Sequence, residues 1–356
     1  MNLGILYFRD EPLQVIPALR LRALIAEARL QGVTLTLLQS DFFDLDREQI
    51  SAYCWEGENN WVTRLIHIPE LVIIQGMTIS QEQISLSKWL TKNRTIIADS
   101  GLNKDRLSEL VAASTLSEYI IPTLTIDKAN PTEFITRSLK HWGGGVIKRA
   151  DSNRGIGLLF ISENDGVWKL DSERQKLQGS LSEIVLHANR MIAARLKYRD
   201  YIIQPFLNSS AKDGRPVDIR AHVQKRRDGN WALTRAYVRV AEAGSLLPNF
   251  SKGGYQGELM PFLLQHNALC AENIKEELIS VSIAIAELQD TVAALPLSEL
   301  GLDFLLDENS KLWLVETNAL PQSALHEMER ARHTIGYAIH LYEKQNNQPV
   351  QLSSEV

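Results

Sequence analysis

The chain has 356 residues, of which 44% are hydrophobic and 23% are charged, and its formal net charge at pH 7 is −5. This composition predicts a globular protein with more than one domain, and the mild net acidity gives no general electrostatic reason to bind nucleic acid. No run of about 18 or more apolar residues occurs, which argues against a membrane-spanning helix. The two cysteines, Cys54 and Cys270, form no motif, so we expect a cytoplasmic protein without a disulfide framework.

The first third of the chain alternates predicted strands and helices. Strands are predicted over residues 4–8, 33–38, 71–75 and 95–98, and helices over residues 16–31 and 79–93. Strands separated by helices imply a parallel sheet with helices on its faces. No Gly-x-Gly-x-x-Gly motif follows the first strand, so an NAD-type cofactor is not expected here. The N-terminus also lacks the basic region and the small-residue cleavage site of a signal peptide.

The remaining two thirds have a different pattern, which begins near residue 103. Helices are predicted over residues 104–114, 278–295 and 326–344, and strands over residues 158–161, 201–206 and, in two pieces, 218–240. The basic run Lys225-Arg226-Arg227 precedes the turn signal Asp228-Gly229, which favours a solvated hairpin tip over a nucleic-acid patch. The tail after residue 346 is expected to fray.

A glycine pair follows a lysine in the middle of the chain. Gly155 and Gly157 come shortly after Lys148. Glycines let backbone N–H groups approach phosphate oxygens, and a lysine on a neighbouring strand adds a point charge. No Gly-Lys-Ser/Thr follows, so this is not a Walker A motif. The segment is a candidate phosphate loop, with a plain turn as the alternative.

Two predicted strands carry arginines that face the same side. Asp218 and Arg220 open the first strand, and Arg235 and Arg239 lie on its partner. Guanidinium groups on adjacent strands can converge on a phosphate or a carboxylate, because the fork pairs with both. The alternative is a surface ion-pair ladder that includes Asp218, and the residues alone leave both readings open.

Near the C-terminus, two apolar runs separated by the turn-rich residues 307–310 predict a β-hairpin. Side chains alternate between the two faces of a strand. If Leu306 lies opposite Lys311, then Asp303 lies opposite Leu314.

Three oxygen-bearing side chains, Asp303, Glu316 and Asn318, would then share one face of this hairpin. Both faces are otherwise largely apolar, where unpartnered carboxylates would be costly. Mg²⁺ is held in proteins by one or two carboxylates together with substrate phosphates. We therefore favour a metal site over the alternative, which is a pair of solvent-facing strand charges.

The order of these motifs covers most of the last two thirds of the chain. It runs lysine, glycine loop, Gln-Pro-Phe, Asp-x-Arg, arginine, Asn-x-x-x-Gly-Gly, aspartate and Glu-x-Asn. This order resembles the ATP-grasp ligases, and the chain looks most like their YheC/YheD (endospore coat-associated) branch. The branch resemblance rests on residues 216–225, 229–231, 236–241, 249–254, 299–303 and 312–318. Trp61 ahead of residues 68–72 also fits the N-terminal domain of that branch.

The resemblance implies an α/β chain with the α+β ATP-grasp fold, in which the nucleotide lies between two sheets. It implies an N-terminal parallel-sheet pre-ATP-grasp domain over residues 1–100 and a linker helix with the lid subdomain over residues 101–205. The C-terminal ATP-grasp subdomain with the metal site would cover residues 206–345, and a tail residues 346–356.

The resemblance also implies a nucleotide site. Two lysines, Lys104 and Lys148, would reach the phosphates of ATP. The other contacts would come from the glycine loop (Arg154, Gly155, Gly157), the hinge that reads adenine (Gln204, Pro205, Phe206, Leu207), the ribose side (Asp218) and a phosphate or substrate contact (Asn249).

The catalytic residues implied by the resemblance are Arg220 and Arg239, which would face the γ-phosphate and the acyl-phosphate, together with Lys148. Two Mg²⁺ ions are implied, held by Asp303, Glu316 and Asn318, with Glu316 bridging both ions.

The implied activity is an ADP-forming carboxylate–amine ligase that acts through an acyl-phosphate. Its partners would be a small-molecule carboxylate and an amine, an amino acid or a peptide, with no nucleic acid and no membrane. Substrate contacts are expected in residues 208–215 and 255–261. The alternatives are a non-catalytic, ATP-binding structural protein of the spore-coat type and an ATP-grasp kinase. A homodimer is one option for the oligomeric state.

Overall fold

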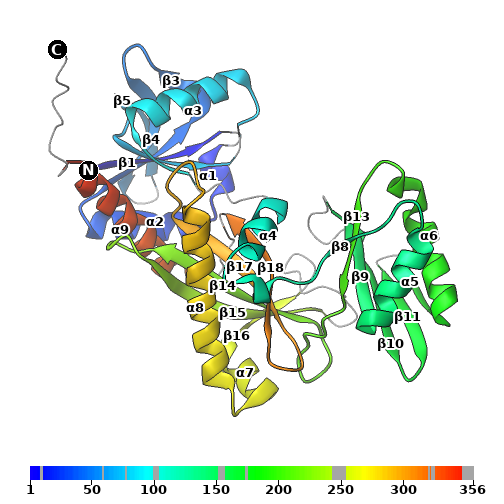
Figure 1. Cartoon of the computed structure of the whole chain (residues 1–356). Coiled ribbons are helices and arrows are strands. Elements are labelled where there is room, and N and C mark those ends of the chain that lie inside the picture. The colour runs from blue at the N-terminus through cyan, green and yellow to red at the C-terminus, as the bar shows by residue number, and fades with distance from the viewer. Residues whose placement is uncertain are drawn as a thin grey trace, which may run out of the picture.

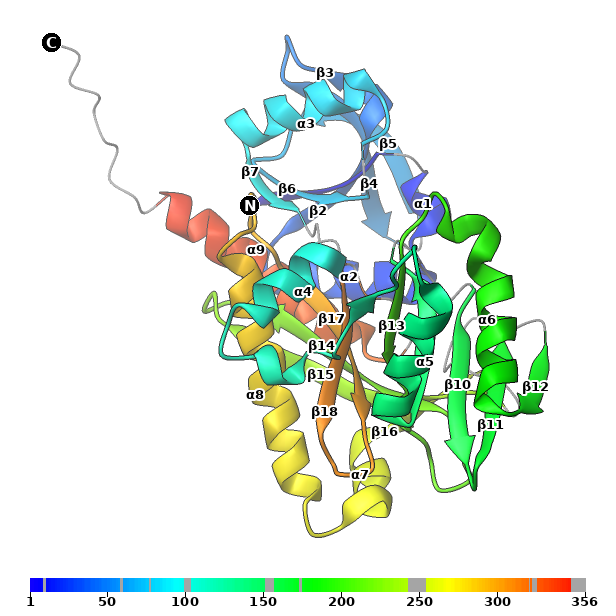
Figure 2. The same ribbon diagram turned by 45° about the vertical axis from the view of Figure 1, so that its right-hand side comes forward.

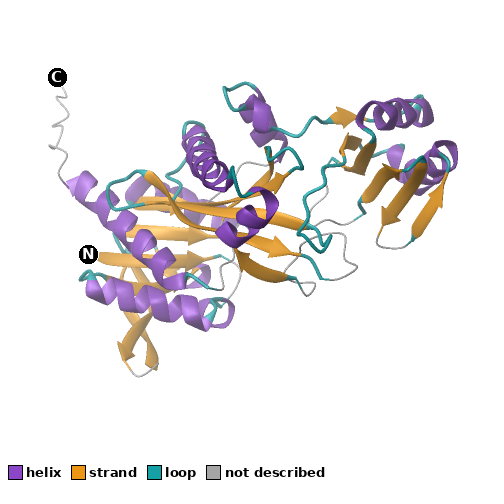
Figure 3. Cartoon of the chain, turned by 90° about the horizontal axis from the view of Figure 1, so that it is seen from below, coloured by secondary structure: helices purple, strands orange, loops and turns teal. Residues whose placement is uncertain are grey.

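The computed structural model describes residues 1–8, 11–57, 60–76, 78–98, 104–150, 157–172, 175–242, 254–319, 321 and 325–346, with Lys104 and Asp105 described by their backbone only. The described residues form three β-sheets, which Figure 3 shows spread along the molecule. Among the described residues, no helix has the length and apolar character needed to cross a membrane.

The first sheet lies at the N-terminal end of the chain (Figure 1). Its strands, in spatial order, are β3 (Phe43–Asp44), β4 (Gln49–Gly57), β2 (Thr34–Gln39), β1 (Asn2–Tyr7), β6 (Leu71–Gln75) and β7 (Thr95–Ala98), with β5 (Asn60–His67) paired to β4. The short elements α1 (Pro12–Val15) and η1 (Ser40–Phe42) and the helices α2 (Ala18–Leu30) and α3 (Gln81–Asn93) accompany it. Strands β2, β1, β6 and β7 are parallel, as predicted. The antiparallel strands β3, β4 and β5 were not predicted from the sequence.

The second sheet is antiparallel and lies apart from the first (Figure 1). Its strands, in spatial order, are β12 (Lys176–Gly179), β11 (Val167–Ser172), β10 (Leu159–Asn164), β9 (Gly144–Arg149), β13 (Tyr201–Pro205) and β8 (Leu124–Thr125). Helices α5 (Pro131–Trp142) and α6 (Leu181–Leu196) pack on it through a shared apolar core. We call this unit the lid sheet.

The capping residues explain where the two helices that pack on the lid sheet begin and end. Ser180 caps α6 and forms a capping box with Glu183, which satisfies backbone donors at the helix start. Helix α5 ends at Gly143, whose φ of 70° is left-handed and suits glycine.

The third sheet, which we call the central sheet, is antiparallel throughout. Its strands, in spatial order, are β16 (Tyr255–Glu258), β15 (Trp231–Val240), β14 (Val217–Lys225), β17 (Glu299–Leu306) and β18 (Leu312–Ala319). The associated helices are α4 (Lys104–Ala112), η2 (Ser117–Tyr119), α7 (Leu259–Asn267), α8 (Ala271–Asp290) and α9 (Glu327–Asn346).

The two faces of the central sheet differ sharply in polarity. Alternate residues of β14 join the apolar core under α8, namely Val217, Ile219, Ala221 and Val223. The intervening residues lie on the opposite face, because side chains alternate along a strand. Helix α9 covers one end of that polar face and also packs against α2 (Figure 2). Helix α9 therefore links this face of the central sheet to the N-terminal unit.

The mixed α/β architecture agrees with the predicted ATP-grasp fold class. The domain boundaries predicted from the sequence stay a prediction. Residues 347–356 of the predicted tail lie outside the described residues.

Candidate functional site

The β17–β18 hairpin corrects the predicted strand register. Leu306 pairs with Leu312, not with Lys311, and Asp303 pairs with Glu316, not with Leu314. The predicted register was therefore wrong.

Two local features explain this difference. Asp307 N donates a hydrogen bond to Lys311 O at 3.0 Å, so the loop holds three residues rather than four, and Ser310 adopts a left-handed φ of 64°. A β-bulge between Asp303 and Phe304 then adds one residue on β18, which shifts the pairing by a second residue in the same direction.

The three predicted metal ligands nevertheless come together. The loop and the bulge together shift the pairing by two residues, which is one side-chain period of a strand. Asp303 and Glu316 therefore face each other, and Asn318 lies two residues further along the same face. Asn318 Nδ2 donates to Asp303 Oδ2 at 3.3 Å and to Glu316 Oε1 at 3.2 Å.

This donor set fits Mg²⁺ only as an incomplete site. Carboxylate and amide oxygens are the ligands that Mg²⁺ takes, and it commonly completes its shell with substrate phosphates and water. The described part of the chain contains no group of three or more His, Cys, Asp or Glu side chains placed to hold a metal. Asp303 and Glu316, with Asn318 turned to present its oxygen, therefore suit a cation that arrives with phosphates.

Two arginines surround the carboxylate of Asp303. Arg220 pairs with it through two nitrogens, Nε to Oδ1 and Nη2 to Oδ2, the latter at 3.0 Å. Arg239 Nη2 approaches Asp303 Oδ2 at 2.9 Å. Arg239 also binds both oxygens of Asp218 at 2.6 Å. Asp303 is only 4% exposed, so these residues form a buried cluster rather than the surface ladder considered as the alternative.

Arg235 does not join this cluster. Its guanidinium pairs instead with Glu258 at 2.7 Å and approaches Glu329 at 4.0 Å. Of the arginines on β14 and β15 that the sequence singles out, only Arg220 and Arg239 converge on Asp303.

Charge and burial set the carboxyl pKa values in the cluster. Burial alone would raise the pKa of Asp303, but the guanidinium groups of Arg220 and Arg239 hold it below its usual range. Burial raises the pKa of Asp218 to about 7. The positive charge of Arg239 acts to lower this pKa, and the negative charge of Asp303 acts to raise it. Asp303 is therefore the carboxylate that stays ionised most firmly.

Gly301 makes room for the Arg220 side chain. A Cβ at Gly301 would lie 3.0 Å from Arg220 Nη1 and 2.7 Å from Pro321 Cβ. Any larger residue would displace one of these neighbours, so glycine at this point of β17 lets the guanidinium reach Asp303.

The predicted hinge lies where the lid sheet meets the central sheet. Gln204 Nε2 donates to Thr123 Oγ1 at 2.7 Å. Gln204 also lines a small pocket with Leu314 and Val315 of β18. The hinge therefore touches the strand that carries Glu316 and Asn318.

Phe206 of the hinge contacts β9 through its backbone and β10 through its ring. Phe206 N donates to Gly144 O at 3.4 Å, and the ring of Phe206 meets that of Phe160 edge-on at 6.4 Å. Gly144 allows this approach, because a Cβ there would lie 3.2 Å from Phe206 Cβ. Pro205 ends β13, directly before Phe206 and Leu207.

The predicted phosphate contacts are described in part. Lys148 lies on β9, opposite Ile202 of β13. Gly157 has a left-handed φ of 74°, which favours glycine. Lys104 is the first residue of α4. Arg154, Gly155 and Asn249 lie outside the described residues.

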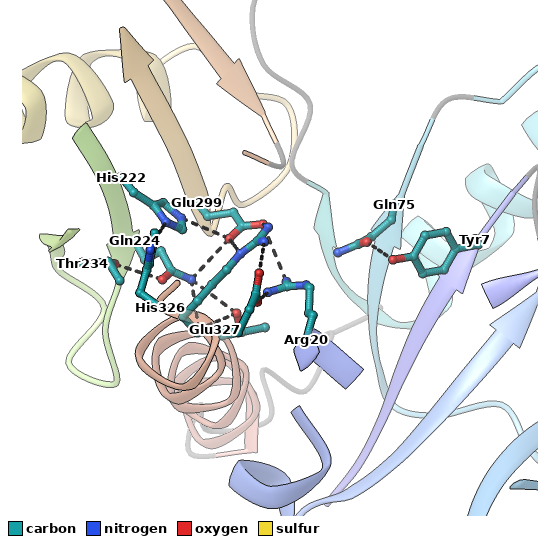
Figure 4. A network of polar contacts seen from close by, with 11 residues as sticks. Tyr7, Arg20, Gln75, His222, Gln224, Thr234, Glu299, His326 and Glu327 are labelled. Atoms are coloured by element: carbon teal, nitrogen blue, oxygen red, sulfur yellow. Dashed lines mark hydrogen bonds and ion pairs between the residues drawn. The ribbon is translucent and has the colours of Figure 1, made fainter. Parts of the chain in front are cut away.

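A second buried polar network occupies the other end of the same face (Figure 4). Arg330 of α9 pairs with both oxygens of Glu299 at 2.5 and 2.7 Å. Glu327 Oε2 accepts from Arg20 of α2 at 3.2 Å. The network therefore ties α2, α9 and the central sheet together. Sequence reasoning missed it, because its members lie on separate elements far apart in the chain.

A pair of histidines belongs to this network. His222 Nδ1 lies 2.8 Å from His326 Nε2, and His222 Nε2 lies 3.4 Å from Glu299 Oε2. Burial lowers the pKa of His326 to about 3, and the neighbouring positive groups, foremost His222, act in the same direction. Across from this network, Tyr7 donates to Gln75 at the ends of β1 and β6, at 2.5 Å (Figure 4).

Two curated proteins are similar to the chain over much of its length. It is 24% identical over 310 residues to the endospore coat-associated protein YheD of Bacillus subtilis (strain 168), which covers 82% of this chain and 67% of YheD. It is 27% identical over 251 residues to the endospore coat-associated protein YheC of the same organism, which covers 68% of this chain and 66% of YheC. The matches thus span about two thirds of the length of each relative.

Solved structures share the fold at low sequence identity. The C-terminal domain of K. lactis Pby1, an ATP-grasp enzyme, matches with a TM-score of 0.53 at 12% identity, over 100% of this chain and 97% of that one. The D-cycloserine synthetase DcsG matches with a TM-score of 0.53 at 13% identity, over 95% and 100%. The D-alanyl-alanine synthetase A of Vibrio cholerae O1 matches with a TM-score of 0.50 at 12% identity, over 97% of each chain.

These likenesses show the ATP-grasp fold. A model of the YheC/D-like ATP-grasp family matches residues 93–341. Because that match covers more than half of the 356 residues, the chain belongs to the YheC/D-like ATP-grasp family.

Proposed function

We propose that this protein is an ADP-forming carboxylate–amine ligase that acts on an amino acid or a peptide through an acyl-phosphate. The observation that carries the proposal is the convergence of Asp303, Glu316 and Asn318 with Arg220 and Arg239 on the polar face of the central sheet. Oxygen ligands beside two guanidinium groups suit a metal-bound triphosphate. Membership of an ATP-grasp family supports the same activity.

In this proposal the nucleotide lies between the lid sheet and the central sheet. The hinge backbone near Gln204 and Phe206 would bind adenine, and Asp218 would lie on the ribose side. Lys148 would reach the phosphates from the lid sheet, because an ammonium group pairs with phosphate as a point charge. The remaining proposed contacts come from Lys104, the glycine loop (Arg154, Gly155, Gly157), Pro205, Leu207 and Asn249.

The proposed reaction has two steps. An oxygen of the substrate carboxylate attacks the γ-phosphorus, the bond to the β–γ bridging oxygen breaks, and ADP leaves with the electron pair. The amine nitrogen then attacks the acyl carbon, the bond to the phosphate oxygen breaks, and the amine loses a proton as inorganic phosphate leaves. Arg220 and Arg239 would neutralise charge on the transferring phosphoryl group and on the acyl-phosphate.

Bound Mg²⁺ would shield the phosphate charge and lower the barrier to attack by an anion. Glu316 would bridge two such ions, with Asp303 and Asn318 each serving one. We also propose that the protein works in the cytoplasm, and that its domains divide near residues 100 and 205.

The test is to incubate the protein with Mg-ATP and a panel of amino acids and peptides, then to measure ADP release and to identify the products by mass spectrometry. We expect ADP together with a product that is heavier than its acid by the amine minus water. D303N should abolish both, whereas D228N, which changes an exposed aspartate at the β14–β15 turn, should leave them intact.

Other outcomes would replace the proposal. A stable phosphorylated product without an amide would identify a kinase. ATP binding without ADP release for any candidate, including a metabolite extract, would favour a nucleotide-binding structural protein. The second outcome would agree with the names of the relatives YheD and YheC, which are endospore coat-associated proteins.

A further inference from the structure

Asp303 is hydrogen-bonded through both of its carboxylate oxygens. Its Oδ2 accepts from Arg220 at 3.0 Å and from Asn318 at 3.3 Å, and it lies 2.9 Å from Arg239 Nη2. Its Oδ1 accepts from Arg220 Nε. The lone pairs that a cation would use are therefore directed at guanidinium groups.

A divalent cation and Arg220 compete for the same carboxylate. Both are positive and both require the Asp303 oxygens, so coordination of a metal there requires that Arg220 withdraw. Arg220 is itself only 7% exposed, and a buried guanidinium that leaves its carboxylate must find another anion. The phosphates of a nucleotide are suitable, because the guanidinium fork pairs bidentately with phosphate as it does with carboxylate.

Arg239 can release Asp303 more easily than Arg220 can. It keeps two hydrogen bonds to Asp218 at 2.6 Å, and its side chain is 19% exposed. Arg220 has Asp303 as its ion-pair partner among the described residues. The exchange of partners therefore depends chiefly on Arg220.

We propose that Arg220, assisted by Arg239, is the resident counter-ion of Asp303, so that a divalent cation and the nucleotide phosphates bind cooperatively. The phosphates take the guanidinium groups, and the cation takes the carboxylate that they release. This inference rests on the proposed function, because it requires that the polyphosphate of ATP bind beside the β17–β18 hairpin. Such coupling is reciprocal: whatever the phosphates add to the metal affinity, the metal adds to the nucleotide affinity.

The first experiment measures Mn²⁺ binding to nucleotide-free protein by electron paramagnetic resonance. Wild-type protein should retain Mn²⁺ weakly, and R220M should bind it at least about tenfold more tightly, a factor that corresponds to about 1.4 kcal/mol. R220K, which keeps a charge but loses the fork, should fall between them. R226M, which changes an exposed arginine at the β14–β15 turn, should match wild type.

A double variant locates the effect. If the gain in R220M arises at Asp303, then the variant with both R220M and D303N should lose it. Circular dichroism of each variant checks that the fold is kept, and R220K serves in place of R220M if the latter fails to fold. Equal Mn²⁺ affinity in wild type, R220M and R220K would overturn the proposal.

The second experiment measures binding of a fluorescent ATP analogue in the presence of EDTA. R220M should bind it at least about tenfold more weakly than wild type and R226M do, because the phosphates lose a bidentate partner. Unchanged affinity would also overturn the proposal.

The experiments can exclude the proposed cation–phosphate coupling without excluding the ligase activity, and the reverse. If wild type releases ADP and forms an amide, but R220M binds Mn²⁺ as wild type does, only the coupling is excluded. A shift in Mn²⁺ binding and in nucleotide binding without any turnover would remove only the ligase activity.

Discussion

Arg239 joins Asp218 to Asp303: its guanidinium binds both oxygens of Asp218 and lies 2.9 Å from Asp303 Oδ2. The ribose-side acid and the metal-side acid of the proposed site therefore share one cation. This arrangement makes the site an electrostatic unit, in which a change at one carboxylate alters the charge balance at the other.

Glu316→Ala should abolish turnover without unfolding the protein. The residue contacts Asn318 on the rim of the cluster, and its loss removes a ligand that both ions would share. We expect ADP release to fall by about a hundredfold or more, the scale seen when one group that stabilises developing charge is removed. The measurement is coupled ADP release together with a thermal melt. Turnover near the wild-type rate would show that the metal assignment is wrong.

Gly301→Ala should disturb Arg220 by direct steric contact. The added Cβ would lie 3.0 Å from Arg220 Nη1 and 2.7 Å from Pro321 Cβ, so we expect a loss of about 1–3 kcal/mol in the free energy of unfolding. Weaker nucleotide binding in EDTA should accompany it. Denaturant titration and the fluorescent analogue measure the two effects.

Gly257→Ala is the matched control for Gly301→Ala. Its Cβ would meet Val238 Cγ2 at 3.1 Å, and Val238 belongs to the apolar core under α8, on the face of the sheet opposite to the arginine cluster. Nucleotide binding should be unchanged in this variant. An equal loss of nucleotide affinity in both variants would rule out a specific role for Gly301.

The face shared by the proposed ligands could be predicted from the sequence, because strand side chains repeat every two residues. The register could not, because it depends on the three-residue loop after Asp307 and on a bulge at Asp303. Each of these shifts the pairing by one residue in the same direction, and a total shift of two residues returns each side chain to the same face. The conclusion about the face was therefore right although the pairing behind it was wrong.

Two other features were hidden for different reasons. Strands β4 and β5 lack the clean alternation of apolar and polar residues that marks a half-buried strand. The buried network could not be read locally, since Arg20 and Glu327 are 307 residues apart in the chain. Long-range ion pairs of this kind leave no periodic signal in a sequence.

Arg330→Met should destabilise the protein strongly. Arg330 is 4% exposed and neutralises the buried Glu299, so its loss leaves an uncompensated charge that costs about 3–5 kcal/mol. Arg226→Met breaks an exposed pair with Asp228 and should cost less than about 1 kcal/mol. Urea unfolding of the two variants compares them. Equal losses would mean that the network does not hold α9 to the central sheet.

The histidine pair predicts how stability depends on pH. Burial holds the pKa of His326 near 3 in the folded protein, whereas the ordinary value is 6.5. Below pH 6.5 the unfolded chain therefore binds a proton at His326 that the folded protein does not bind, so acidification favours unfolding. The stability that the protein has with a neutral His326 is fully present above pH 6.5, and it is lost progressively as the pH falls from 6.5 toward 3.

His326→Gln isolates this contribution, because glutamine keeps a polar partner for His222 and does not titrate. Between pH 7.5 and 5 the thermal midpoint of wild type should fall more steeply than that of His326→Gln, even if the variant is less stable at pH 7.5. His67→Gln removes an exposed histidine and should follow the slope of wild type. Parallel slopes for wild type and His326→Gln would show that His326 is not held neutral in the folded protein. A shallower slope in His326→Gln alone would assign the acid sensitivity to the pair that joins β14 to the start of α9.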